Sequence, residues 1–163
     1  ATAATVKLSW DKSAYAPGEK ATLRVEVLSS TGTAVPNATF ANLFATGGIS
    51  LSSAAGNGSE TITSVSITTS TSAQDYVGTS TTGAKLYTVY MPASGATVTA
   101  SATGGTSLAT AGQVKVSASA SVTDSGAAAL AAVTALATTV ASLKTLITTL
   151  TNLVLKIQKK VKA

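Results

Sequence analysis

Residues 124–163 carry an uninterrupted apolar heptad pattern, and this pattern constrains the fold more than any other feature of the sequence. Two rows of apolar residues alternate at spacings of three and four, as in helices that pack against one another. We call these ten positions the seam: Ala129, Val133, Leu136, Val140, Leu143, Ile147, Leu150, Val154, Ile157 and Val161. A single helix cannot bury such a stripe by itself. The pattern therefore predicts a second apolar surface, either on another copy of the chain or on a different partner.

The segment that carries the seam is expected to form one long helix. From 127 to 162 the sequence contains neither proline nor glycine, which allows a single helix of roughly 50 Å at about 1.5 Å per residue. Asp124 or Ser125 can cap its start, and the terminal lysines favour its negative end. β-branched residues in one row of the seam and leucine in the other favour parallel dimers. Leu146 and Leu153 widen the apolar stripe, however, and suit three or more helices.

Residues 1–123 show the pattern of a β-sheet domain instead. Apolar and polar residues alternate strictly in Thr22–Val27 and again from Val114 to Val122, which predicts two strands with one buried face each. Further strands are expected at about 5–10, 38–44, 59–68, 84–91 and 96–102, about seven in total. Turns are expected at Pro17-Gly18, Ser30-Thr31-Gly32 and Ala93-Ser94-Gly95. The expected fold class is mainly β with one long C-terminal helix: an Ig-like antiparallel β-sandwich over 1–123, then a coiled-coil-type α-helix over 124–163.

Large aromatic side chains are expected to fill the space between the sheets of this sandwich. The candidates are Trp10, Phe40, Phe44, Tyr76, Tyr87 and Tyr90. The stretch from Gly47 to Thr82 is rich in Ser, Thr and Gly and interrupts the strand spacing. We expect long loops there, at an end of the sandwich where contact surfaces of such folds often lie.

The residue composition excludes several kinds of chemistry. The chain has no cysteine and no histidine, which removes disulfides, thiolate metal sites, thiol nucleophiles and imidazole bases. Carboxylates such as Asp11 and Glu19 lie near lysine or arginine in the sequence, so we expect solvated ion pairs rather than an acid–base pair. The sequence lacks a nucleophile elbow, and Gly104-Gly105 lacks the context of a phosphate-binding loop. Three acids never cluster as calcium would require. We therefore expect neither an enzyme nor a cofactor or metal site.

The composition also favours a location outside the cell. Only 10% of the residues are charged, which suits an extracellular protein whose surfaces are covered by neighbours or sugars. The first residue is Ala1 rather than Met, as expected of an exported chain without its signal peptide, although another kind of boundary would look the same. Asn37 and Asn57 each begin an acceptor pattern for N-glycosylation, a pattern that is also common by chance.

The surplus positive charge of the chain is concentrated in its C-terminal segment. The lysines of this segment are Lys144, Lys156, Lys159, Lys160 and Lys162, and its one acid is Asp124. The last four lysines could hold an anionic cell-wall polymer or a lipid headgroup, or they could form a solvated helix end. They stand in one short block without interleaved aromatic residues or arginine. Nucleic-acid binding is therefore not expected.

A membrane-spanning helix is the competing interpretation of the same segment. Ala127 to Leu155 contains one charge, Lys144, and precedes a lysine cluster that would lie in the cytoplasm of a cell with an exported domain. A lysine in the middle of a span costs about 2.5 to 3.5 kcal/mol on insertion scales, and the segment is rich in threonine. Because lipid demands no heptad register, we favour self-association over spanning.

Four runs of the sequence resemble secreted surface-layer-type proteins of actinobacteria. They are SAYAPGEKATLRVEV from Ser13 to Val27, LYTVYMP from Leu86 to Pro92, ATAGQVKVSASASVTD from Ala109 to Asp124, and LTNLVLKIQKKVKA from Leu150 to Ala163. The resemblance implies an exported Ig-like module followed by an assembling helix, with copies that form a layer or fibre on the cell surface. This chain departs from longer proteins of that type in having one β module and a short alanine-rich entry to the helix.

The sequence thus predicts a non-enzymatic, extracellular structural subunit. Its partner is another copy of itself, and the C-terminal helix is the joint through which copies assemble into a surface layer or filament. The alternative is a membrane-tethered adhesion module on the cell surface, which binds glycan or protein through its loops and has a C-terminal transmembrane helix.

Overall fold

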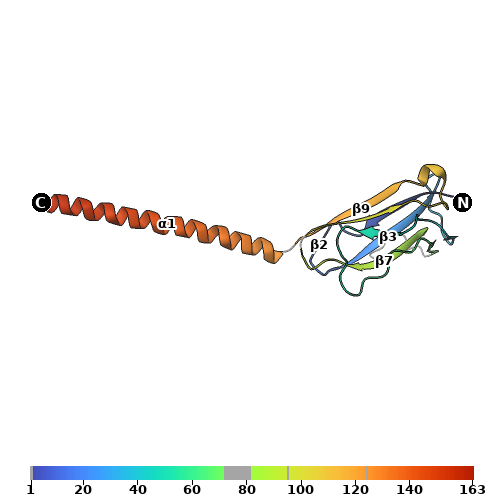
Figure 1. Cartoon of the computed structure of the whole chain (residues 1–163), viewed down its shortest axis with the longest axis horizontal. Coiled ribbons are helices and arrows are strands. Elements are labelled where there is room, and N and C mark those ends of the chain that lie inside the picture. Colours follow the sequence, from blue (N-terminus) through green and yellow to red (C-terminus); the bar gives the residue numbers. More distant parts are fainter. Residues whose placement is uncertain (1, 72–81, 95, 124) are drawn as a thin grey trace. The chain divides into compact units, whose positions relative to one another are not determined.

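The computed structural model describes residues 2–71, 82–94, 96–123 and 125–163. The chain divides into two compact units, Ala1–Thr123 and Asp124–Ala163, which we call the β unit and the helical unit. As expected, the first is mostly antiparallel β-sheet and the second is one long helix (Figure 1).

The strands of the β unit form three sheets. The first is antiparallel, in the order β1 (Ala3–Trp10), β3 (Lys20–Ser29) and β7 (Ala84–Tyr90). The second has the order β2 (Ala14–Tyr15), β9 (Lys115–Val122), β8 (Thr97–Thr103) and β5 (Ser50–Leu51). In this sheet β2 runs parallel to β9, and the other neighbours are antiparallel. A small third sheet pairs β4 (Thr39–Phe40) with β6 (Ile67–Thr68), and a short 3₁₀ helix, η2, spans Thr110–Gly112.

Strict alternation places one face of β3 in the core. Leu23, Val25 and Val27 are 0% exposed, whereas Arg24 and Glu26 between them are only partly buried. This is the period of two that a pleated strand imposes on its side chains. Leu23, Val25 and Val27 join residues of both larger sheets in one hydrophobic cluster, among them Leu8, Val89, Ala100 and Ala102. The two larger sheets therefore share a core.

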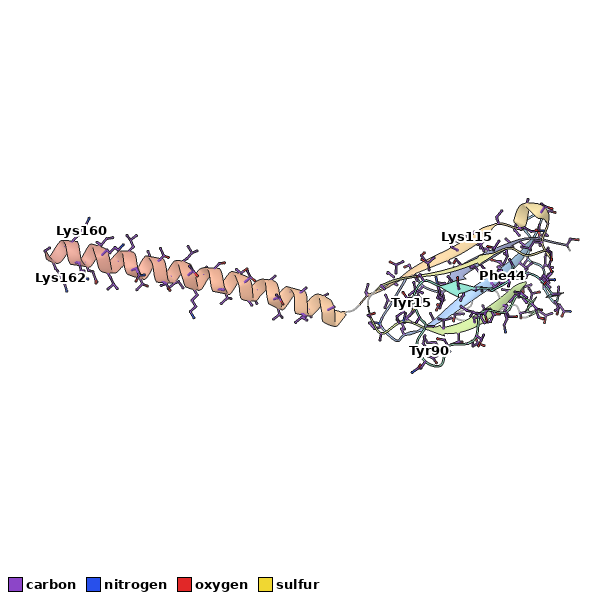
Figure 2. The ribbon with its side chains drawn as sticks, in the orientation of Figure 1. Tyr15, Phe44, Tyr90, Lys115, Lys160 and Lys162 are labelled. Carbon is purple, nitrogen blue, oxygen red and sulfur yellow. The ribbon has the colours of Figure 1, made fainter. Side chains whose placement is uncertain are left out.

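A second, smaller cluster lies around Tyr15. Its members are Tyr15, Ala21, Met91, Val98, Ala120 and Val122. Trp10 packs against both clusters, and its ring meets that of Tyr15 edge-on at 6.3 Å and 73°. Tyr15 and Phe44, both labelled in Figure 2, are 2% and 1% exposed. Most of the large rings thus serve the core, as expected, although Tyr15 was not among the candidates and Tyr76 lies outside the described residues.

The five strands of seven or more residues match the sequence-based expectations, and the two-residue strands do not. The predicted strands at 5–10, 22–27, 84–91, 96–102 and 114–122 correspond to β1, β3, β7, β8 and β9. The predictions at 38–44 and 59–68 were wrong in extent, because only Thr39–Phe40 and Ile67–Thr68 form strands there. β2 and β5 were not predicted, since two residues carry no alternation.

The backbone hydrogen bonds of 59–66 explain why the strand predicted there does not form. The backbone N–H of Glu60 donates to the Thr88 carbonyl at 2.9 Å, but the Ile62 carbonyl accepts from Ile49, on a different segment. No single partner strand accompanies 59–66, so its alternation builds no ladder. Val114, expected to start a buried face, precedes β9 and is 54% exposed.

The expected turns fall where glycine adopts positive φ. Gly18 has φ 71° and Gly32 has φ 77°, conformations that cost a side-chain-bearing residue free energy. The third expected turn includes Gly95, which lies outside the described residues.

The helical unit consists of α1 (Ser125–Lys162), one helix without a break (Figure 1). This confirms the long C-terminal helix predicted from the absence of proline and glycine. Of the two predicted caps, Asp124 lies outside the described residues, as does the side chain of Ser125.

Candidate assembly surface on the C-terminal helix

The seam forms an exposed apolar stripe along α1. All residues from 126 to 163 are exposed, and the large seam side chains from Val133 to Val161 retain between 45% and 80% of their accessible surface. At 3.6 residues per turn, spacings of three and four keep all ten positions on one side of the helix. The helix therefore aligns the predicted seam residues on one side and leaves their side chains exposed.

The apolar surface is wider than the seam. Leu146 and Leu153 flank it on one side, and Leu130 and Leu155 lie on the other flank, all more than half exposed. At about 100° per residue, the large apolar side chains span about 220° of the helix circumference. Sequence reasoning did not single out Leu130 and Leu155, because they lie outside the heptad register. Leu130 and Leu155 could have been identified from the sequence by their hydropathy alone.

Hydroxyl groups on α1 are satisfied by the helix itself. Eight side chains each donate a hydrogen bond of 2.8–3.2 Å to the carbonyl oxygen four residues earlier. They are Thr134, Thr138, Thr139, Ser142, Thr145, Thr148, Thr149 and Thr151. Burying an unbonded hydroxyl carries a penalty, and these bonds remove it. The helix can therefore be covered by an apolar surface on several sides.

The lysine cluster lies at the C-terminal end of α1. Lys156, Lys159, Lys160 and Lys162 are exposed, and Figure 2 shows Lys160 and Lys162 in the last turns. Residues 125–163 contain no aspartate or glutamate. Among the described residues, the ion pairs join Lys12 to Glu19 and Arg24 to Glu26, all in the β unit. The positive charge of the helix is thus not compensated within the helix.

The carboxylates considered as acid pairs have local partners in the β unit. Glu19 accepts hydrogen bonds from the Lys12 ammonium and from the backbone N–H of Ala16, and the two together hold the pKa of Glu19 below its ordinary value. Asp11 accepts from the Tyr15 hydroxyl and from the Thr22 backbone N–H. Both carboxylates stabilise the turn around Pro17-Gly18.

Both predicted glycosylation acceptors are exposed. Asn37 adopts φ 51°, the left-handed conformation that asparagine tolerates in turns. Asn57 precedes Gly58, whose φ is 88°. The hydroxyl of Ser59, the third residue of that pattern, donates to the Gly56 carbonyl at 2.7 Å and accepts from the Tyr90 N–H. Glycosylation itself stays a prediction.

The described part of the β unit carries open, shallow depressions. One of about 310 Å³ lies over β5, β8 and β9, where Ser50, Ser101 and Ser117 surround Lys115. Among the described residues no three His, Cys, Asp or Glu side chains gather as a metal site would need. The Nε of Arg24 is buried without a hydrogen-bond partner in the described structure, next to Glu26 on the central strand.

The apolar helix also meets the requirements of a membrane span by length and composition. The segment that does so is Gly126–Lys162, and none of its most apolar window is buried. Comparison with protein-family models finds none that matches this chain, and comparison with curated proteins finds no match.

Proposed function

We propose that this chain is an extracellular structural subunit that assembles with copies of itself through α1 into a surface layer or filament. The observation that carries the proposal is the uncovered seam, whose ten positions keep one heptad register along the helix. Soluble proteins rarely expose so much contiguous apolar surface unless a partner covers it. A copy of the same helix presents a matching stripe, and knobs-into-holes packing requires this register.

The breadth of the apolar surface supports more than two helices in each assembly. A two-stranded coiled coil covers only a narrow seam, whereas Leu146, Leu153, Leu130 and Leu155 extend beyond it. The self-bonded threonines between them present methyl groups rather than free hydroxyls. Three or more helices would cover both flanks.

In this proposal the β unit is an Ig-like sandwich that forms the exposed face of the assembly. Support comes from its two larger sheets, which share one hydrophobic cluster. The low content of charged residues supports a crowded extracellular surface, since neighbours rather than water would cover much of it.

The second candidate is a membrane-tethered adhesion module. Its specific support is that Gly126–Lys162 is long and apolar enough to span a bilayer, with hydroxyls that need no water. Two features favour assembly instead. Lipid contact requires no heptad register, and Lys144 would lie within the span.

The test replaces two seam leucines by a charged residue. Leu143→Asp with Leu150→Asp should abolish ordered polymer in negatively stained electron micrographs, because each leucine contributes about 1.5 to 3 kcal/mol when buried and the carboxylates resist burial. The matched control is Thr138→Asp with Thr145→Asp, which adds the same charge at the same spacing on the side of α1 opposite the seam. Polymer that survives the seam variant would contradict the proposal. A requirement for detergent to keep the unmodified chain in solution would favour the membrane candidate.

A further inference from the structure

Three of the four lysines at the end of α1 face away from the seam. Taking about 100° per residue, Lys156, Lys159 and Lys160 lie at least about 120° from the midline of the seam, and Lys162 lies on its flank, about 80° from it. Ile157 and Val161 belong to the seam and are interleaved with these lysines. When other helices cover the seam, Lys156, Lys159 and Lys160 therefore remain on the outside, and Lys162 lies beside the covered surface. We call Lys156, Lys159, Lys160 and Lys162 the lysine girdle.

Assembly multiplies the charge of the girdle. Each copy contributes four ammonium groups within about 9 Å along the helix axis, and no acid of α1 opposes them. If helices associate in parallel, the girdles of all copies lie at one end of the assembly and repel one another. Ion screening weakens this repulsion but does not remove it at short range.

We propose that the lysine girdle binds a linear, phosphate-bearing polyanion, and that this binding promotes assembly through the seam. The inference rests on the proposed self-association. A polymer with many phosphates can contact the girdles of several copies at once, which turns separate weak contacts into one multivalent contact. Repulsion between helix ends is then replaced by attraction to a shared counterion.

The arrangement of the lysines favours a flexible polymer over a flat lipid surface. The girdle extends around the outside of the helix and along about two turns, whereas a planar surface across the helix end would contact only the last turn. A nucleic acid is disfavoured because residues 125–163 contain no arginine and no aromatic residue to stack on bases. The ammonium groups can bind phosphates alone.

The experiment measures assembly of the full chain by sedimentation velocity, with inorganic polyphosphate as the probe. Polyphosphate should lower the protein concentration needed for assembly, whereas orthophosphate at equal ionic strength should not. Counterion release predicts a binding constant that falls about 50-fold from about 50 to 200 mM salt if four phosphates are neutralised per copy. In the variant Lys159→Gln with Lys160→Gln, the fall in the binding constant over the same salt range should be about sevenfold. This variant should also assemble more readily than the unmodified chain when polyphosphate is absent.

Controls separate this inference from the proposed function. Lys7→Gln with Lys20→Gln removes the same charge from exposed positions of the β unit and should leave the polyphosphate response unchanged. An equal loss of the polyphosphate response in this control would overturn the proposed role of the girdle and leave self-association intact. The same conclusion would follow if polyphosphate did not change the protein concentration needed for assembly. Tighter binding to anionic vesicles or to oligothymidylate than to polyphosphate would also overturn it. Failure to assemble under any condition would contradict the proposed function itself.

Discussion

The indole nitrogen of Trp10 donates a hydrogen bond of 3.1 Å to the carbonyl oxygen of Ala118, which links the end of β1 to β9. The two strands belong to different sheets, and Trp10 packs against both hydrophobic clusters. This contact therefore helps to hold the two sheets of the β unit together.

Trp10→Phe should destabilise the β unit. The substitution removes the donor and leaves the Ala118 carbonyl without this partner, a loss of about 1 to 3 kcal/mol, in addition to the lost ring volume. Urea unfolding followed by circular dichroism measures the change. An unchanged unfolding midpoint would show that the bond does not contribute to stability.

Leu23→Ala should destabilise the β unit more strongly, by about 2 to 5 kcal/mol, because Leu23 is 0% exposed and its loss leaves a cavity. Trp10 fluorescence reports the unfolding of this unit. The matched control is Leu143→Ala, which removes the same atoms from a 53% exposed position of α1. This control should leave the Trp10 transition in place, and an equal shift would contradict the independence of the two units.

The sequence predicts the burial of a residue well when that burial follows from the pattern of its own segment, and poorly when it depends on residues far away in the sequence. In β3 the alternation of Leu23, Val25 and Val27 was sufficient, because a long strand with one buried face has a single register that hides its apolar residues. Tyr15 could not be identified as a core residue, since it lies in a two-residue strand and is buried by residues far away in sequence. The same holds for 59–66, whose partners change along the segment.

The seam was predictable because, unlike the burial of Tyr15, it does not depend on residues far away in the sequence. The position of each seam residue on the helix depends only on the helical period. In the proposed assembly the seam is covered by other copies of the helix, and the helical period of one chain does not specify how many.

The ion pair between Lys12 and Glu19 should give the turn at Pro17-Gly18 a dependence on acid. The pKa of Glu19 is lowered below 4.5, first by the hydrogen bond from Lys12 and then by the Ala16 N–H. Since the folded pKa is the lower one, the stabilisation is present above the unfolded value and is lost as pH falls through the folded value. Carboxyl NMR should show Lys12→Met raising the pKa of Glu19 towards 4.5. An unshifted titration in that variant would contradict the assignment.

Tyr87 should make the β unit sensitive to alkali. Burial of Tyr87, a residue that is 6% exposed, raises the pKa of its hydroxyl above 10.0, and the Glu60 carboxylate adds to the effect. The contribution of the neutral hydroxyl to the free energy of unfolding is fully present below pH 10.0, the pKa in the unfolded chain. It is lost as pH rises through the pKa of Tyr87 in the folded state. Ultraviolet absorbance of tyrosinate should show a late-titrating component that is lost in Tyr87→Phe. Glu60→Gln should move that group towards 10.0, and no movement would contradict the role of Glu60.

Sedimentation equilibrium of the unmodified chain, without detergent and over a range of concentrations, tests the central claim most directly. The account predicts a defined species or polymer with several times the mass of the 15.9 kDa chain, which reverts to single chains when Leu143 and Leu150 are replaced by aspartate. A single 15.9 kDa species that persists at the highest concentration would contradict it.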